Sequence, residues 1–382
     1  MEITNVSVLK NSSIVLLRYI IIICLLLYFN SHCAPSNKSV FLSKNLPIPR
    51  LCGWFAEDSK ATEEEILGNF TYFKLQGIEC VNYMTDLPKY ERAAKIAQKI
   101  GIQIYAWLPA MLGLGFNKKW LYENHPEVYV VTKSGINSYN QAIYGVSHYK
   151  FLCPNNPIVR TYLKEMYDNI SQIPEIDGIN LDYIRYIEMN MKEYNPNGDT
   201  CYCDYCVSSF LNQTGINIKE HQDPNSVQEW ADYRVNVITS LVNEIAKIVN
   251  SNGKRISANV YPGPWQSTRQ TRQKCDDWDL DMVFPMIYTE VFQRDVNWIG
   301  AQTGEGIAVL NEKHRTTKLY TGLQANQMND EDFKKGVDLA YENGAYGISV
   351  FTLNTINSEK FEILRNETKN FIEKKSNETR PT

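Results

Sequence analysis

Apolar and polar positions alternate along residues 176–186, and this pattern predicts a buried β-strand. The alternation places Ile179 and Leu181 on one face of the strand and Asn180 and Asp182 on the other. The apolar face is expected to pack against a layer of helices. The polar face ends in a carboxylate, so Asp182 is the first candidate for chemistry.

Apolar runs of this kind recur along the chain and alternate with helical patterns. The predicted strands are residues 50–56, 78–84, 102–109, 176–186, 256–261, 282–288, 319–323 and 347–351. The predicted helices are residues 62–75, 89–100, 156–170, 227–250, 295–312, 330–343 and 358–373, with a short helix within 263–279. Such alternation implies a parallel sheet, and eight repeats favour a closed α/β barrel, the (β/α)8 TIM barrel. It forms a single domain with long loops after the third and fourth strands, at residues 110–154 and 188–224.

The composition and the first turn exclude two classes of partner. An open nucleotide-binding sheet needs a glycine-rich turn after its first strand, and residues 56–60 contain no glycine. The chain has 39 basic and 43 acidic residues, a net charge of -4, and no strongly basic block in its body. Nucleic acid is therefore not an expected partner.

The first 33 residues differ from the rest of the chain. An apolar run at residues 14–29 follows Lys10, which suits a signal peptide spanning residues 1–33. Cys33 stands where a lipoprotein would be cleaved, although His32 fits that site poorly; an ordinary cleaved signal and an uncleaved anchor are the alternatives. We therefore expect an exported protein of the cell envelope, periplasm or surface, whose membrane contact is limited to this signal or a lipid on Cys33.

The remaining boundaries follow from composition. Residues 34–48 are polar and predict a flexible tether, residues 49–373 form the barrel, and residues 374–382 predict a disordered tail. The oligomeric state is left open.

The active site of such a barrel is built from side chains at the strand ends. Glycosidic bond cleavage needs two carboxylates, and Asp182 with Glu290 is the predicted pair. Glu290 is chosen because it lies two residues beyond Tyr288 on the same strand face. The predicted substrate-binding residues share amide, charged or aromatic groups at strand ends, which suit a ligand covered in hydroxyls: Trp54, Glu57, Asn82, Trp107, Asn180, Arg185, Asn259, Tyr261, Tyr288 and Gln324.

Several alternatives stay open for these carboxylates. Glu57, Asp58 and Asp86 are rivals of Glu290 for the second role. Any of them could instead cap the following helix. Asp182 itself could serve only to cap the next loop or to pair with a neighbouring arginine.

The strand-four sequence also resembles a known family. Residues 177–186 read Asp-Gly-Ile-Asn-Leu-Asp-Tyr-Ile-Arg-Tyr, which is similar to the signature of the glycosyl hydrolase-like "family 10" proteins of bacterial envelopes. Residues 153–157 and 284–288 resemble two further segments of that family. The resemblance spans roughly residues 50–372 and implies a TIM barrel acting on carbohydrate, with Asp182 in the position of the proposed catalytic acid group.

A more distant similarity is to the family-18 chitinases, whose fourth strand reads Asp-Gly-x-Asp-x-Asp-x-Glu. Here Asn180 stands at the third acidic position and Ile184 replaces the catalytic glutamate. Isoleucine cannot protonate a leaving group, which argues against chitinase chemistry by that route.

Four cysteines form a second candidate site. The run Cys201-x-Cys203-x2-Cys206 lies in the loop after the fourth strand, and Cys153 lies in the loop after the third. Adjacent strands bring those loops together, so four thiolates could bind a structural zinc ion. The group is similar to the zinc cluster of family-42 β-galactosidases. Disulfides within the group or with Cys275 are the alternative in an exported protein.

The other two cysteines of the predicted barrel receive a different prediction. Cys52 and Cys80 lie within predicted strands and are expected to be small, buried apolar side chains.

These observations predict a glycoside hydrolase that cleaves an oligo- or polysaccharide at the cell envelope with paired carboxylates. No cofactor is expected to be required for catalysis, and zinc would be structural. The alternative is a catalytically inactive, carbohydrate-binding barrel, because the second carboxylate is not fixed by the sequence.

Overall fold

The computed structural model describes residues 43–58, 60–113, 118–189 and 194–378. The predicted signal peptide with Cys33, the first part of the predicted tether, and residues 379–382 of the predicted tail lie outside these residues. Within the described ranges, no helix has both the length and the apolar character needed to cross a membrane.

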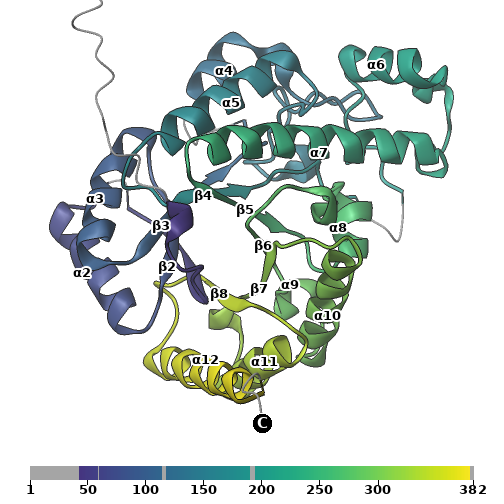
Figure 1. Ribbon diagram of the computed structural model, residues 1–382. Helices are drawn as coiled ribbons and strands as arrows, with labels where there is room; N and C mark the ends of the chain where they lie inside the picture. Colours follow the sequence, from purple (N-terminus) through teal and green to yellow (C-terminus); the bar gives the residue numbers. More distant parts are fainter. Residues whose placement is uncertain (1–42, 59, 114–117, 190–193, 379–382) are drawn as a thin grey trace, which may run out of the picture. The chain divides into compact units, whose positions relative to one another are not determined.

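Eight parallel strands close into a barrel in which β8 pairs with β1. The strands are β1 (Leu51–Ala56), β2 (Cys80–Met84), β3 (Gln103–Pro109), β4 (Gly178–Asp182), β5 (Arg255–Val260), β6 (Met282–Pro285), β7 (Lys318–Leu323) and β8 (Gly347–Phe351). Each strand neighbours its predecessor in the sequence, and helices surround the strands (Figure 1). The predicted (β/α)8 TIM barrel is confirmed.

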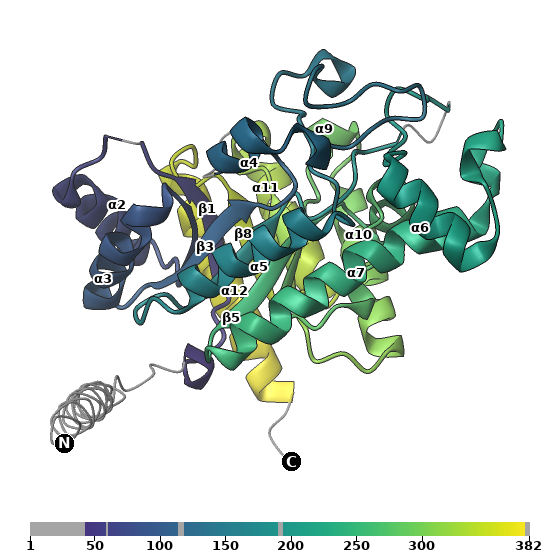
Figure 2. The same cartoon turned by 90° about the horizontal axis from the view of Figure 1, so that it is seen from above.

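The helices follow the strands in the predicted alternation, and two of them, α4 and α6, lie in the long loops after β3 and β4. The helices are α2 (Glu63–Leu75), α3 (Tyr90–Ile100), α4 (Lys119–Asn124), α5 (Pro157–Ser171), α6 (Asp204–Thr214), α7 (Gln228–Ser251), α8 (Pro264–Thr271), α9 (Thr289–Phe292), α10 (Asn297–Glu312), α11 (Asp330–Glu342) and α12 (Ser358–Glu378). In Figure 2, α6 lies beyond one end of α7, away from the strands.

The predicted signals for helix ends act as expected. Thr62 and Glu65 form a capping box: the Thr62 Oγ1 accepts from the Glu65 backbone N–H, and the Glu65 carboxylate accepts from the Thr62 backbone N–H at 2.8 Å. Gly101 ends α3 with a φ of 74°, a left-handed conformation that glycine adopts without steric cost.

Alternation along each strand divides the barrel into an inner and an outer layer. Outward side chains such as Phe55 and Tyr83 belong to the main core, which includes the helices. The inward apolar side chains form a second buried cluster: Cys52, Trp54, Cys80, Tyr105, Trp107, Met282, Phe284 and Tyr320. The barrel interior is thus a packed core, and chemistry is confined to its ends.

Cys52 and Cys80 are buried, as predicted, but they form a disulfide bond, so the prediction that they are simply small apolar side chains is wrong. They occupy paired positions in the register of β1 and β2, with their Cα atoms 4.6 Å apart. Because both side chains point inward from adjacent strands, the two sulfur atoms meet inside the barrel.

Residues 44–48, which were assigned to the flexible tether, pack at the amino-terminal end of the barrel. The Arg255 guanidinium donates to the Leu46 carbonyl, and the Tyr346 hydroxyl donates to the Ile48 carbonyl at 3.1 Å. The barrel domain therefore begins several residues before the predicted boundary.

Helix α12 also passes the predicted boundary and continues to Glu378. Residues 374–378 are therefore helical, although they were assigned to a disordered tail. No glycine or proline interrupts the helix, and Lys375 pairs with Glu378 on its last turn at 3.1 Å.

The long loop after β4 is fixed to α7 by a buried ion pair. The Arg234 guanidinium donates to the Asp199 carboxylate at 2.6 Å, and the side chains are 1% and 0% exposed. Arg234 also donates to the Thr200 carbonyl at 2.9 Å, and the Tyr202 hydroxyl donates to Asp199 at 2.6 Å. These hydrogen bonds pair the two buried charges and set the position of the cysteines that follow, although Nη2 of Arg234 has no hydrogen-bond partner among the described residues.

Candidate active site

Asp182 is the last residue of β4 and lies at the carboxyl end of the strands. Its side chain is buried and accepts two hydrogen bonds from N–H groups. The Trp107 indole donates to Oδ2 at 2.8 Å, and the Tyr183 backbone N–H donates to Oδ1 at 2.8 Å. One oxygen is thus held by the end of β3 and the other by the turn that follows β4.

Burial raises the pKa of Asp182 above its usual range, because the ionised form loses hydration. The hydrogen bonds from Trp107 and Tyr183, the charge of Arg185 and a hydrogen bond with Asn259 oppose this shift. Desolvation outweighs them. A carboxyl group with a raised pKa at a strand end suits proton transfer to or from a substrate.

Asn180 lies one inward position below Asp182 and is fully buried. Its amide donates to the Ser257 hydroxyl at 2.9 Å and to the Asn259 side-chain oxygen at 3.1 Å, and it accepts from the Trp54 indole at 3.4 Å. Trp54 is buried as well. This network holds the side chain of Asn259, which contributes to the electrostatic surroundings of Asp182.

Arg185 is buried among three aromatic rings at the same end of the barrel. Its guanidinium carbon lies 4.8 Å from the Tyr183 ring centre, 5.3 Å from that of Tyr261 and 5.6 Å from that of Phe151. The guanidinium donates to the Glu188 carboxylate at 2.7 Å. Two predicted residues, Arg185 and Tyr261, are therefore brought together beside the strand that bears Asp182.

Aromatic side chains cover another side of the carboxylate. The Tyr288 ring lies 5.7 Å from that of Phe351, and the Trp107 ring lies 6.3 Å from it. Burial raises the pKa of Tyr288, and the neighbouring charge of Asp182 adds to this. Trp107 and Tyr288 thus both lie beside Asp182.

Glu290 does not have the geometry that led to its choice. Strand β6 ends at Pro285, whereas the sequence predicted a strand to residue 288. Glu290 lies in the short helix α9 and is exposed. Strand alternation therefore does not relate it to Tyr288, and the argument for pairing it with Asp182 is wrong.

Three other predicted residues lie away from Asp182 or have no partner. Glu57 lies two residues after the outward-facing Phe55 of β1. Its carboxylate accepts a hydrogen bond from the Thr85 hydroxyl at 2.7 Å and lies 3.7 Å from the Arg92 guanidinium on α3. Within the described chain, Asn82 is fully buried with neither side-chain polar atom hydrogen-bonded, and the buried Oε1 of Gln324 also has no partner.

Sequence reasoning missed Glu188, which accepts hydrogen bonds from Arg185 and from the Tyr149 hydroxyl, each at 2.7 Å. Its position three residues after Arg185 was the one feature of the sequence that could have indicated this ion pair. It also missed Tyr183, whose φ of 45° is rare for a residue with a side chain. Unusual backbone of this kind is common where a functional group must be aimed.

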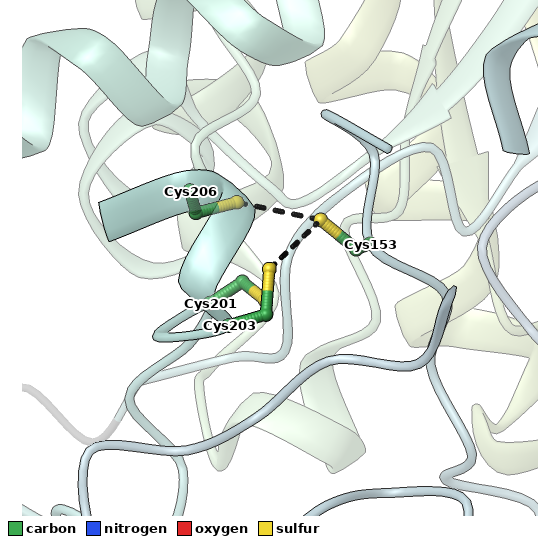
Figure 3. A group of neighbouring side chains, drawn as sticks. All are labelled: Cys153, Cys201, Cys203 and Cys206. Atoms are coloured by element: carbon green, nitrogen blue, oxygen red, sulfur yellow. Dashed lines mark hydrogen bonds between the residues drawn. The ribbon is translucent and has the colours of Figure 1, made fainter. Parts of the chain in front are cut away.

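The four predicted cysteines lie together. The sulfur atoms of Cys153, Cys201, Cys203 and Cys206 are all within 4.8 Å of one another, and none is in a disulfide. Cys153 faces the other three from a separate segment (Figure 3). The group is the metal-binding candidate that the spacing predicted.

Comparison with protein families identifies the chain. The model of the glycosyl hydrolase-like 10 proteins matches residues 90–338. This protein belongs to the glycosyl hydrolase-like 10 family. The match begins at α3 and ends within α11. Three strands of this glycosyl hydrolase-like 10 barrel, β1, β2 and β8, lie outside the matched region. No curated protein sequence matches it.

Solved structures share the fold. The glycoside hydrolase domain of PgaB (BpsB) from Bordetella bronchiseptica is 14% identical, with a TM-score of 0.58 over 85% of this chain and 98% of that one. The catalytic domain of β-amylase from Paenibacillus polymyxa is 12% identical, with a TM-score of 0.58 over 87% and 99%. The endo-β-1,4-mannanase from Thermotoga petrophila is 8% identical, with a TM-score of 0.56 over 86% and 78%. At these identities, the likeness shows a common barrel.

Proposed function

We propose that this protein is a glycoside hydrolase in which Asp182 transfers a proton at the scissile glycosidic bond. The observation that carries the proposal is a buried carboxyl group with a raised pKa at the carboxyl end of β4. Protonated Asp182 would donate to the leaving oxygen as its bond to the anomeric carbon breaks, and water would supply the new bond to that carbon. Membership of the glycosyl hydrolase-like 10 family supports this reaction class.

We propose a carbohydrate as the ligand. Trp107, Tyr261 and Tyr288 offer aromatic surface beside Asp182 and Arg185, and such surface covers the apolar face of a sugar ring. Asn259 and Arg185 offer hydrogen-bonding groups at the same strand ends.

The second carboxylate is proposed to be Glu188 rather than Glu290. Glu188 shares two neighbours with Asp182, because both carboxylates interact with Arg185 and with Tyr183. Glu290 is exposed on α9. If Glu188 stabilises positive charge at the anomeric carbon, Glu188→Gln should lower the rate more than Glu290→Gln does.

The test is a sugar-release assay on aryl glycosides, β-1,4-mannan and glycans of the cell envelope, run beside a binding titration. Asp182→Asn is expected to lower turnover about 10²–10⁴-fold while binding is retained, since proton transfer contributes in that range. Asp338→Asn on α11 is the matched control, because Asp338 is on the helical surface and pairs with Lys334.

Unchanged turnover in Asp182→Asn would refute the assignment. Binding without turnover by the wild-type protein across the whole panel would instead favour the carbohydrate-binding barrel as its function.

We also propose that the protein is exported to the cell envelope, periplasm or surface. The apolar run at residues 14–29 supports export, and so does the Cys52–Cys80 disulfide, since disulfides persist in oxidising compartments. Cell fractionation with and without residues 1–33 tests this. Labelling with a radioactive fatty acid tests lipid attachment, which Cys33→Ala should abolish.

A further inference from the structure

We propose that Cys153, Cys201, Cys203 and Cys206 bind one zinc ion in a closed tetrahedral site that holds together the loops after β3 and β4. The proposal does not depend on the hydrolase activity. It rests on the sulfur geometry, on the burial of the group and on the hydrogen bonds that lead from it to the active site.

The distances between the sulfur atoms match a shared metal. Four sulfurs at about 2.3 Å from zinc in a tetrahedron lie about 3.8 Å apart. Cys153 Sγ lies 3.4 Å from Cys206 Sγ and 3.9 Å from Cys203 Sγ, and all four sulfurs lie within 4.8 Å of one another. Cys153 therefore faces two sulfurs at once, as a metal ligand would.

The same distances argue against disulfide bonds in this group. A disulfide joins two sulfurs at about 2.05 Å, whereas Cys153 Sγ lies at non-bonded distances from both Cys203 Sγ and Cys206 Sγ. In this structure Cys52 and Cys80 are bonded, whereas the four clustered cysteines and Cys275 are free.

The surroundings suit a structural zinc site rather than a catalytic one. Cys153, Cys201 and Cys206 are buried, and Cys203 is half-buried. Four thiolates fill the coordination shell and leave no position for water or substrate. Thiolate ligands also favour zinc over magnesium or calcium, which prefer oxygen.

Tyr186 supplies an independent indication of a charged group at this place. It lies beside Cys206, Cys153 and Cys201 and is buried. Its hydroxyl has no hydrogen-bond partner among the described residues. The hydroxyl lies near enough to these cysteines to interact electrostatically with the negative charge that zinc-bound thiolates would carry.

Backbone hydrogen bonds connect the cysteines to the catalytic strand. Leu152, which precedes Cys153, donates to the Met111 carbonyl at 2.8 Å, and the Met111 N–H donates to the Tyr183 carbonyl at 3.2 Å. The Ala110 N–H donates to the carbonyl of Asp182 itself at 2.6 Å. Zinc bound by Cys153 would therefore stabilise the strand end that presents the catalytic carboxyl.

The experiment measures zinc in the purified full chain by plasma mass spectrometry and by X-ray absorption at the zinc edge. About one zinc per chain with four sulfur ligands at about 2.3 Å is the expected result. Protein that holds no metal after exposure to zinc, or that shows two extra disulfides by mass, would overturn the proposal. An iron tetrathiolate, visible by its colour, would overturn the choice of zinc.

Two variants localise the site. Cys206→Ser is expected to lose zinc, whereas Cys275→Ser, which removes a buried cysteine outside the group, should keep it. Equal zinc content in Cys206→Ser and wild type would exclude this site, and the wild-type measurements remain decisive if Cys206→Ser does not fold.

Discussion

Asp182→Asn is expected to change how the free energy of unfolding depends on pH. Burial raises the pKa of Asp182 in the folded protein, whereas an unfolded aspartate titrates near about 3.9. The protonated carboxyl thus contributes stability that is fully present below about pH 3.9 and is lost as the pH rises through the folded-state pKa. Asparagine does not titrate, so the wild-type protein should lose stability relative to the variant across this window.

The size of the change follows from linkage. Each unit by which the folded-state pKa exceeds the unfolded value corresponds to about 1.4 kcal/mol in the difference between the two proteins. The variant also loses stability by an amount that does not depend on pH. Trp107 and the Tyr183 backbone both donate to Asp182, and an amide has only one accepting oxygen. Leaving one buried donor unpaired costs about 1–3 kcal/mol.

The assay is urea denaturation of both proteins from about pH 4 to about pH 8, with Asp338→Asn as the control for an exposed carboxylate. The difference in unfolding free energy between wild type and Asp182→Asn should decrease as the pH rises. A difference that is constant or that increases with pH would contradict a raised pKa for Asp182, and with it the proton-transfer role.

Three further changes are predicted from other contacts, each checked by urea denaturation. Trp107→Phe removes the indole donor that opposes the raised pKa, so the pH window described above should move upward, and an unmoved window would argue against this hydrogen bond. Asp199→Asn should cost about 3–5 kcal/mol because it leaves the buried Arg234 charge uncompensated, and a cost near zero would mean that water reaches the pair. Replacing both Cys52 and Cys80 by serine should cost about 3.5 kcal/mol, the chain-entropy value for a separation of 28 residues, and the cost should be smaller in reduced protein, where only the burial of the serine hydroxyls remains.

The sequence was sufficient to predict the barrel and the position of Asp182, because both depend on local patterns. A period of two fixes which side chains point inward, and the alternation of strands with helices fixes the parallel order. The cysteine group was predicted for a similar reason, since loops after adjacent strands must lie side by side.

The second carboxylate could not be predicted in this way, because it depends on where a strand ends. Strand β6 stops at Pro285, three residues before the predicted end, and Glu290 consequently lies on α9. Pro285 itself has no N–H to donate, and although the Met286 and Ile287 N–H groups still bond to Val260 and Gly322, the chain turns into α9 at Thr289. Glu188 was missed because only the folded loop shows that Arg185 and Tyr149 both bind it.

The Cys52–Cys80 pairing depends on the register of β1 against β2, which hydrophobic periodicity does not give. A shift of one residue would turn one of these side chains outward. Glu57 was misplaced for a different reason, which is the face of β1 on which it lies. It lies two residues after the outward-facing Phe55, on the same face of the strand. Its carboxylate therefore meets Arg92 on α3 rather than the barrel mouth.

The Cys52–Cys80 disulfide has a consequence for how the chain matures. Oxidants that join this pair also meet the four clustered thiols, which lie close enough to one another to be joined wrongly. If those thiols already hold zinc when oxidation begins, metal coordination keeps them from competing as nucleophiles, and Cys52 and Cys80 pair with each other by default. Zinc supply during folding would then set the yield of correctly paired protein.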